Sequence, residues 1–108
     1  MGAGPCRRLN GSRFPGPGSV GVELRDLLRR GRRVIANLRF AEHATIDEHS
    51  ADFDIDVIRL CGGGFVSVNR NAVPFSCGEL IAWPAGVIHC LWTEASSMET
   101  LMVEHHKA

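Results

Sequence analysis

The twelve residues "GELIAWPAGVIH", Gly78 to His89, decide the fold of this chain. Pro84 and Gly86 interrupt the stretch, so it cannot form a helix and instead predicts a strand, a tight turn and a second strand. The second strand, "VIHCLWTE", follows the turn directly and carries His89 near its start, with apolar neighbours on both sides. We expect the turn to swing the chain so that this imidazole points into a β-structure.

The rest of the chain from Val34 onward carries the same signal. Short β-branched or alternating stretches are separated by turn residues, among them the glycine run 62–64. In "HATIDEHS", strict alternation places Ala44 and Ile46 on one face and His49 on the other. Six to eight such strands at even spacing predict an all-β fold, an antiparallel barrel or jelly roll over residues of about 34 to 104.

The N-terminal part has a different composition. Residues 1–42 carry a net charge of +6 and residues 43–108 a net charge of −6. We expect residues 1–33 to be a basic leader and N-terminal segment, with a flexible start, and residues 34–108 to be the barrel domain. The stretch "VELRDLLRRGRR", residues 22–33, could form a short helix that Gly31 would end, while "SVGVEL", residues 19–24, fits a strand equally well. The leader has no aromatic interleaving and no nucleic-acid motif, so we expect no nucleic-acid partner.

Length and composition narrow the class of protein. A chain of 108 residues forms one domain with one core. No apolar run approaches the ~18 residues that a membrane span needs, so we expect no membrane partner. The four cysteines form no C-x-x-C pair, and we expect buried, reduced thiols. These observations favour a cytoplasmic location.

The stretch that ends at His89 resembles the second motif of the cupins, a superfamily of RmlC-like jelly-roll barrels. Gly78, five residues, Pro84, Ala85, Gly86, two residues and His89 match its pattern G-x5-P-x-G-x2-H, and Thr93 stands where the motif has Asn. The resemblance covers residues of about 34 to 104.

Residues 46–68 resemble the first cupin motif in a degraded form. His49 matches its first histidine, but Ala51 stands at the second histidine position. The glutamate position is Ile55 with the shorter spacing and Asp56 with the longer one. The resemblance therefore implies a metal site made of His49 and His89, with Asp56 as third ligand. Such a site would hold one divalent ion (Fe, Mn, Ni or Zn) less completely than a full cupin site.

Aromatic side chains near these histidines suggest walls for a small-molecule pocket. We expect this pocket to be lined by Trp83, Trp92, Phe53 and Phe65. Two functions stay open: a cupin that binds a small molecule without assured catalysis, and a metal-dependent cupin enzyme of the dioxygenase or isomerase type.

Two further expectations concern the ends of the chain. We expect a homodimer in which residues of about 18 to 30 contact the partner, adding a strand to the edge of its sheet. His105 and His106 lie beside Lys107, and we expect them to be frayed and exposed.

Overall fold

The computed structural model describes residues 9–15 and 18–107, and all regular structure in these ranges is β. The strands are β1 (Ser12–Arg13), β2 (Ser19–Arg30), β3 (Arg33–His49), β4 (Asp54–Gly62), β5 (Phe65–Val68), β6 (Asn71–Val73), β7 (Leu80–Trp83), β8 (His89–Trp92) and β9 (Met98–His105). The predicted all-β fold is therefore confirmed. No helix in the described ranges is long and apolar enough to cross a membrane.

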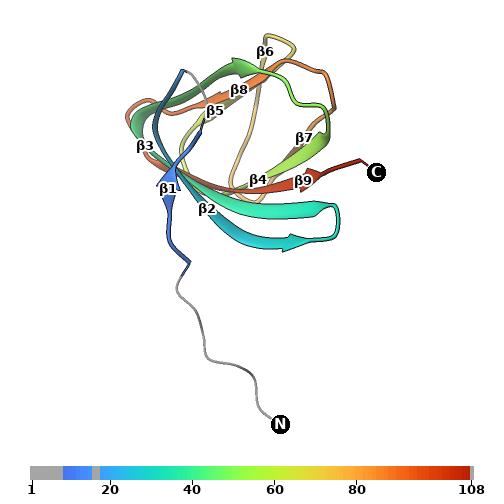
Figure 1. The fold of residues 1–108 in the computed structure, drawn as a ribbon. Coiled ribbons are helices and arrows are strands. Elements are labelled where there is room, and N and C mark those ends of the chain that lie inside the picture. Colours follow the sequence, from blue (N-terminus) through green and yellow to red (C-terminus); the bar gives the residue numbers. More distant parts are fainter. Residues whose placement is uncertain (1–8, 16–17, 108) are drawn as a thin grey trace.

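The strands form one antiparallel sheet that curls into a barrel-like wall (Figure 1). The order is β6-β5-β8-β3-β9-β4-β7, with β2 paired to β3 and β1 paired to β2. One edge of β3 pairs with β2, while the other pairs first with β9 and then with β8. The backbone of β3 changes direction between these partners, where His43 adopts a φ of 55°. This long bent strand joins the two halves of the barrel.

The N-terminal strand β2 belongs to the barrel wall. It pairs with β3 from Ser19 to Arg30, which excludes the helical alternative for residues 22–33. The expected domain boundary at residue 33 falls inside this hairpin, so the barrel begins before residue 34. In this hairpin, the backbone groups of β2 that face β3 are paired with that strand. The start of the expected flexible leader, residues 1–8, lies outside the described residues, as do residues 16 and 17.

The core lies on the concave face of the sheet. Alternate residues of β3, β4, β8 and β9 point inward, as a period of two requires. The largest of the fully buried side chains include those of Phe40, Leu38, Leu91, His89 and Val57. A polar residue thus sits within the apolar interior.

Candidate metal and ligand site

A type II turn places His89 at the start of β8. The amide of Val87 donates to the carbonyl of Pro84 at 3.2 Å, and Gly86 has a φ of 81°. Only glycine adopts this conformation readily at the third position of such a turn. The turn that the motif predicted is therefore present.

The same turn is fixed to the loop that follows His49. The amide of Gly86 donates to the carbonyl of Ala51 at 2.8 Å, and the amide of Ala85 donates to Asp54 Oδ1 at 2.8 Å. These bonds hold the two cupin-like motifs together, although they lie far apart in the sequence.

An irregularity in β3 turns His49 toward His89. Ile46 pairs with Leu91, but His49 pairs with His89, so one extra residue lies on β3 between these partners. Such a β-bulge reverses the face of every later residue. His49 therefore lies beside His89, whereas strict alternation had placed it on the face opposite Ile46.

The two rings converge at their Nε2 atoms. His49 Nε2 and His89 Nε2 are 3.2 Å apart, and the ring planes are inclined by 72°. His89 is only 1% exposed, while His49 is exposed to solvent. The pair therefore joins the barrel interior to the surface.

Backbone carbonyls determine the tautomer of both rings. His49 Nδ1 lies 2.9 Å from the carbonyl oxygen of Asp47, and His89 Nδ1 lies 3.1 Å from that of Val87. A carbonyl only accepts, so each Nδ1 carries the proton. The two Nε2 atoms then direct lone pairs at each other, and a proton or a metal cation between them makes the contact favourable.

The spacing of the two nitrogens fits a shared metal ion. Ligand nitrogens about 2.0–2.1 Å from one ion, at angles between octahedral and tetrahedral values, are about 2.9–3.4 Å apart. The observed separation is 3.2 Å. A carbonyl bonded to the second ring nitrogen is also the usual support of a metal-bound histidine.

The buried ring is held in its neutral form. The pKa of His89 is lowered from 6.5 to about 4, mainly by loss of solvation and to a smaller extent by the charge of His49, while the hydrogen bond to Val87 acts in the opposite direction. A neutral imidazole is the form that can bind a metal ion.

Trp83 forms one wall of the site. Its ring stacks on His89 with centroids 3.8 Å apart and planes inclined by 9°. Trp83 is 2% exposed, and its indole Nε1 is buried with no hydrogen-bond partner in the described part of the chain. A donor of this kind beside His89 suits a polar group of a bound ligand.

The predicted third ligand, Asp56, does not join this site. Ile55 and Val57 are buried, so Asp56 points to the outer face of β4, where its Oδ2 lies 2.9 Å from His105 Nε2. The shorter motif spacing is therefore the correct one, and it places Ile55 at the glutamate position. Within residues 9–15 and 18–107, no three His, Cys, Asp or Glu side chains could hold a metal ion.

Of the four aromatic residues predicted to line the pocket, only Trp83 stacks on the histidine pair. Trp92 and Phe65 stack on each other with centroids 5.5 Å apart. Both alternate with inward-facing residues of β8 and β5, so they lie on the outer face. Phe53 lies against His106, with centroids 4.0 Å apart. The prediction failed because aromatic character alone does not fix the face of a strand.

Other polar residues also differ from expectation. His105 belongs to β9, and His106 Nε2 donates to Glu104 Oε1 at 2.8 Å, so neither is frayed. Cys61 and Cys77 are exposed rather than buried.

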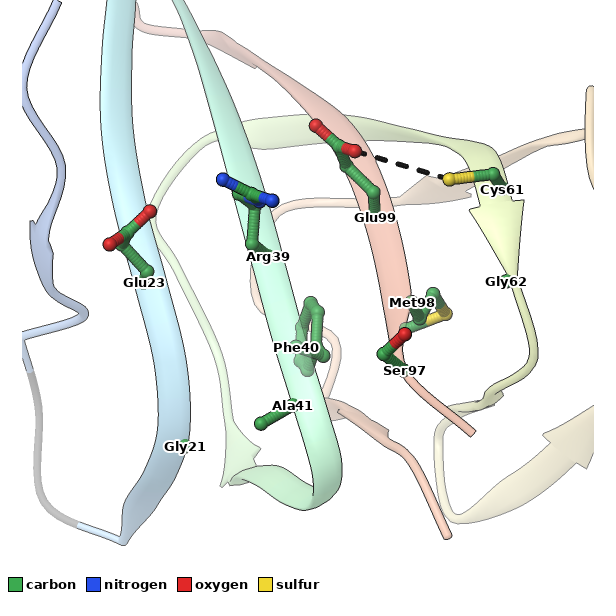
Figure 2. A pocket seen from close by; sticks show the side chains of 10 residues that line it. All are labelled: Gly21, Glu23, Arg39, Phe40, Ala41, Cys61, Gly62, Ser97, Met98 and Glu99. Carbon is green, nitrogen blue, oxygen red and sulfur yellow. Dashed lines mark hydrogen bonds between the residues drawn. The ribbon is translucent and has the colours of Figure 1, made fainter. Parts of the chain in front are cut away.

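A groove of about 530 Å³ lies on the outer face, away from the histidine pair. Figure 2 shows Glu23, Arg39 and Glu99 side by side along it, followed by Cys61. These residues are successive cross-strand partners on β2, β3, β9 and β4. Because their charges alternate, they stabilise the pairing of these strands.

Comparisons with known proteins identify the fold. No family model matches the chain, and no curated protein matches it. Solved structures do match. The polyketide cyclase RemF from Streptomyces resistomycificus superposes with a TM-score of 0.84 at 18% identity, over 99% of this chain and 81% of that one.

Two further structures extend the comparison. An RmlC-like cupin from Shewanella frigidimarina gives a TM-score of 0.81 at 13% identity, over 93% of this chain and 86% of that one. A predicted oxalate decarboxylase from Thermotoga maritima gives 0.81 at 19% identity, over 92% and 94%. The chain thus has the fold of a small, single-domain cupin, as the second motif predicted.

Proposed function

We propose that this cupin-fold chain binds a small molecule at the His49–His89 pair, with one divalent metal ion held weakly between the two Nε2 atoms. The observation that carries this proposal is the convergence of two Nε2 lone pairs at 3.2 Å, each ring oriented by a carbonyl. Imidazole is a good ligand for Fe, Ni and Zn and a poorer one for Mn, so we expect Ni²⁺ and Zn²⁺ to bind best.

Weak binding follows from the number of ligands. A catalytic zinc site usually has three protein ligands. Here Ala51 and Ile55 replace the other two positions of the motif with side chains that cannot bind a metal. Solvent or the small molecule would fill the remaining positions from the exposed side, where His49 lies, with Trp83 as the apolar wall.

A metal-dependent enzyme is the second candidate. It is favoured by the fold neighbours, which include a polyketide cyclase and a predicted oxalate decarboxylase. Catalysis needs an ion that stays bound through turnover, whereas a binding protein needs only an ion that the ligand helps to hold. Retention of the ion therefore separates the two candidates.

The test is calorimetric titration with Zn²⁺ and Ni²⁺, followed by elemental analysis after dialysis against metal-free buffer. We expect one ion per chain in the titration, lost on dialysis. His49→Ala should abolish binding with little effect on folding, because His49 is exposed. His43→Asn is the matched control, since His43 is also exposed and Asn tolerates its positive φ.

Each outcome decides between the readings. An ion retained at one per chain after dialysis supports the enzyme. Binding that survives in His49→Ala, or that is lost equally in His43→Asn, contradicts a site between the two histidines.

We also propose a homodimer that uses the outer face of the sheet. An apolar strip crosses this face on successive strands: Leu28, Ile35, Val103, Leu101, Ile58 and Leu80. Leu28 and Leu80 are 44% and 56% exposed. Residues 18–30 would contact a second copy through this face, with Leu28 at one end of the strip.

A cytoplasmic location is a further part of the proposal. Cys61, Cys77 and Cys90 are free thiols, which agrees with a reducing compartment.

A further inference from the structure

Two arginines face each other at the end of the β2–β3 hairpin. Arg30 and Arg33 are direct cross-strand partners on either side of Gly31 and Arg32. Gly31 adopts a φ of 59°, which permits this two-residue connection. Arg33 in turn pairs with His105 of β9, so three basic side chains follow one line across three strands.

Like charges that lie directly opposite on neighbouring strands destabilise the pairing. The chain nevertheless places four arginines at residues 29, 30, 32 and 33. Among the residues that the structure describes, the ion pairs within 4.0 Å involve Arg70, His105 and His106 and none of these four arginines. The repulsion between Arg30 and Arg33 is therefore not offset within the described chain.

A hollow lies beside these arginines. Its volume is about 380 Å³, and it is lined by Arg30, Gly31, Arg32, Arg33, His105 and His106. A cavity of this size suits a small ligand or one end of a larger one. Every side chain that lines it is basic, and its only non-basic residue is glycine.

The wall formed by Arg33 is held by a chain of two hydrogen bonds. Arg33 Nε donates to His105 Nδ1 at 3.4 Å, so the proton of the neutral ring lies on Nε2. That nitrogen donates to Asp56 Oδ2 at 2.9 Å. Because only Nε of Arg33 is used, both of its terminal nitrogens stay available. Asp56 and His105 are thus positioning residues for this guanidinium.

The other histidine fixes the C-terminal end of β9 against the hairpin. The amide of His106 donates to the carbonyl of Arg32 at 2.7 Å. Its ring lies against Phe53, and its Nε2 is 2.8 Å from Glu104 Oε1. The carboxylates of Asp56 and Glu104 are therefore each engaged by a histidine, and neither forms an ion pair with the hairpin arginines.

We propose that this hairpin-end pocket, residues 30–33 with His105 and His106, binds the phosphate group of a small molecule. Guanidinium groups bind phosphate through two parallel hydrogen bonds, and two opposed guanidiniums can hold one dianion between them. A phosphate dianion bound between Arg30 and Arg33 attracts both guanidiniums and so offsets their mutual repulsion. The site is separate from the His49–His89 pair and does not depend on it.

The test uses inorganic phosphate as the probe. Thermal unfolding is followed with phosphate and with sodium chloride of equal ionic strength. We expect phosphate to raise the unfolding temperature beyond the chloride control, and calorimetry to show at least a tenfold loss of affinity in Arg30→Gln and in Arg33→Gln. Arg39→Gln is the matched control, because Arg39 lies on β3 and is exposed but faces Glu23 and Glu99. It should bind phosphate as the unaltered chain does.

A second readout separates this proposal from a purely structural role of Arg30. Without phosphate and at low salt, Arg30→Gln should unfold at a higher temperature than the unaltered chain, because the repulsion is removed. A lower temperature would contradict an unsatisfied arginine pair.

Three other results would overturn the proposal. The first is no effect of phosphate beyond that of chloride. The second is binding of a single-stranded oligonucleotide with none of inorganic phosphate, which would indicate a nucleic-acid surface. The third is a decrease in molecular mass by light scattering in Arg30→Gln, which would show that a carboxylate of a second copy occupies the pocket.

Discussion

His49 and His89 are cross-strand partners whose Nε2 atoms lie 3.2 Å apart, while each Nδ1 is bonded to the carbonyl two residues before it. One proton or one metal ion satisfies both nitrogens. A second proton would place two cations in contact, one of them buried. Competition between proton and metal follows from this relationship.

Metal binding should therefore weaken as the pH falls. Both imidazoles must be neutral to bind an ion, and a proton shared between the Nε2 atoms occupies the same place. We expect the affinity for Ni²⁺ measured by calorimetry to fall severalfold between pH 8 and pH 6 and further below pH 6. An affinity independent of pH over this interval would place the ion elsewhere, on ligands such as carboxylates.

The stability of the fold should also depend on pH through His89. Its folded-state pKa is lowered from 6.5 to about 4, so the unfolded chain takes up a proton that the folded chain refuses. The contribution of His89 to the free energy of unfolding is fully present above pH 6.5 and is lost progressively as the pH falls toward 4. It amounts to up to about 3 kcal/mol.

Urea unfolding at several pH values between 7 and 4.5 measures this contribution. His89→Gln should remove it. His49→Ala should reduce it only in part, because loss of solvation is the larger cause of the lowered pKa. If His49→Ala removed the whole dependence, the repulsion between the rings would be the main cause instead.

Truncation of His89 should destabilise the protein even without metal. His89 is 1% exposed and stacks on Trp83, so His89→Ala leaves a cavity beside the indole. We expect a loss of about 2–4 kcal/mol in the free energy of unfolding. His89→Gln keeps much of the volume and should lose less. Equal stability of His89→Ala and the unaltered chain would show that the core refills the space.

The turn before β8 gives a test of local geometry. Gly86 has a φ of 81°, and a Cβ added there would meet no atom within 4 Å. Gly86→Ala should therefore lose only about 1–2 kcal/mol of stability from backbone strain. If the turn positions His89, the same change should also weaken Ni²⁺ binding, and Gly31→Ala, with its φ of 59° at the distant hairpin, should not.

The dimer proposal rests on the apolar strip of the outer face. Replacing Leu28 and Leu80 together by Ser should halve the molecular mass measured by light scattering at tens of micromolar. Leu60→Ser is the control, because Leu60 is 47% exposed but lies outside the strip. A monomeric mass for the unaltered chain would contradict the proposal.

The second cupin motif predicted the fold and the placement of His89, because Pro84 and Gly86 specify a turn by local backbone chemistry alone. Strict alternation of residues along β3 did not predict that the side chain of His49 faces His89. It depends on a bulge in β3, which appears only when the register with β8 is known. The match of His49 to the first cupin motif predicted its place beside His89, whereas the alternation of residues along the strand did not.

The remaining errors have a common physical origin. Asp56 and Trp92 have the right chemistry for a ligand and a pocket wall, but they lie on the outer face of the sheet. A shift of one residue along a strand moves a side chain to the other face of the sheet. The degraded first motif allows two spacings that differ by one residue, so it does not decide which face a side chain occupies. Composition alone assigns the hairpin arginines to the basic N-terminal segment, because only the pairing of β2 with β3 shows that Arg30 opposes Arg33.

The stacking of Trp83 on His89 gives the protein an optical reporter of its own site. The two rings lie almost parallel with centroids 3.8 Å apart. A positively charged imidazole in such contact quenches indole fluorescence, whereas a neutral one does so far less. In a Trp92→Phe background, the emission of Trp83 should follow the charge state of His89 directly, and binding of paramagnetic Ni²⁺ should dim it without any added label.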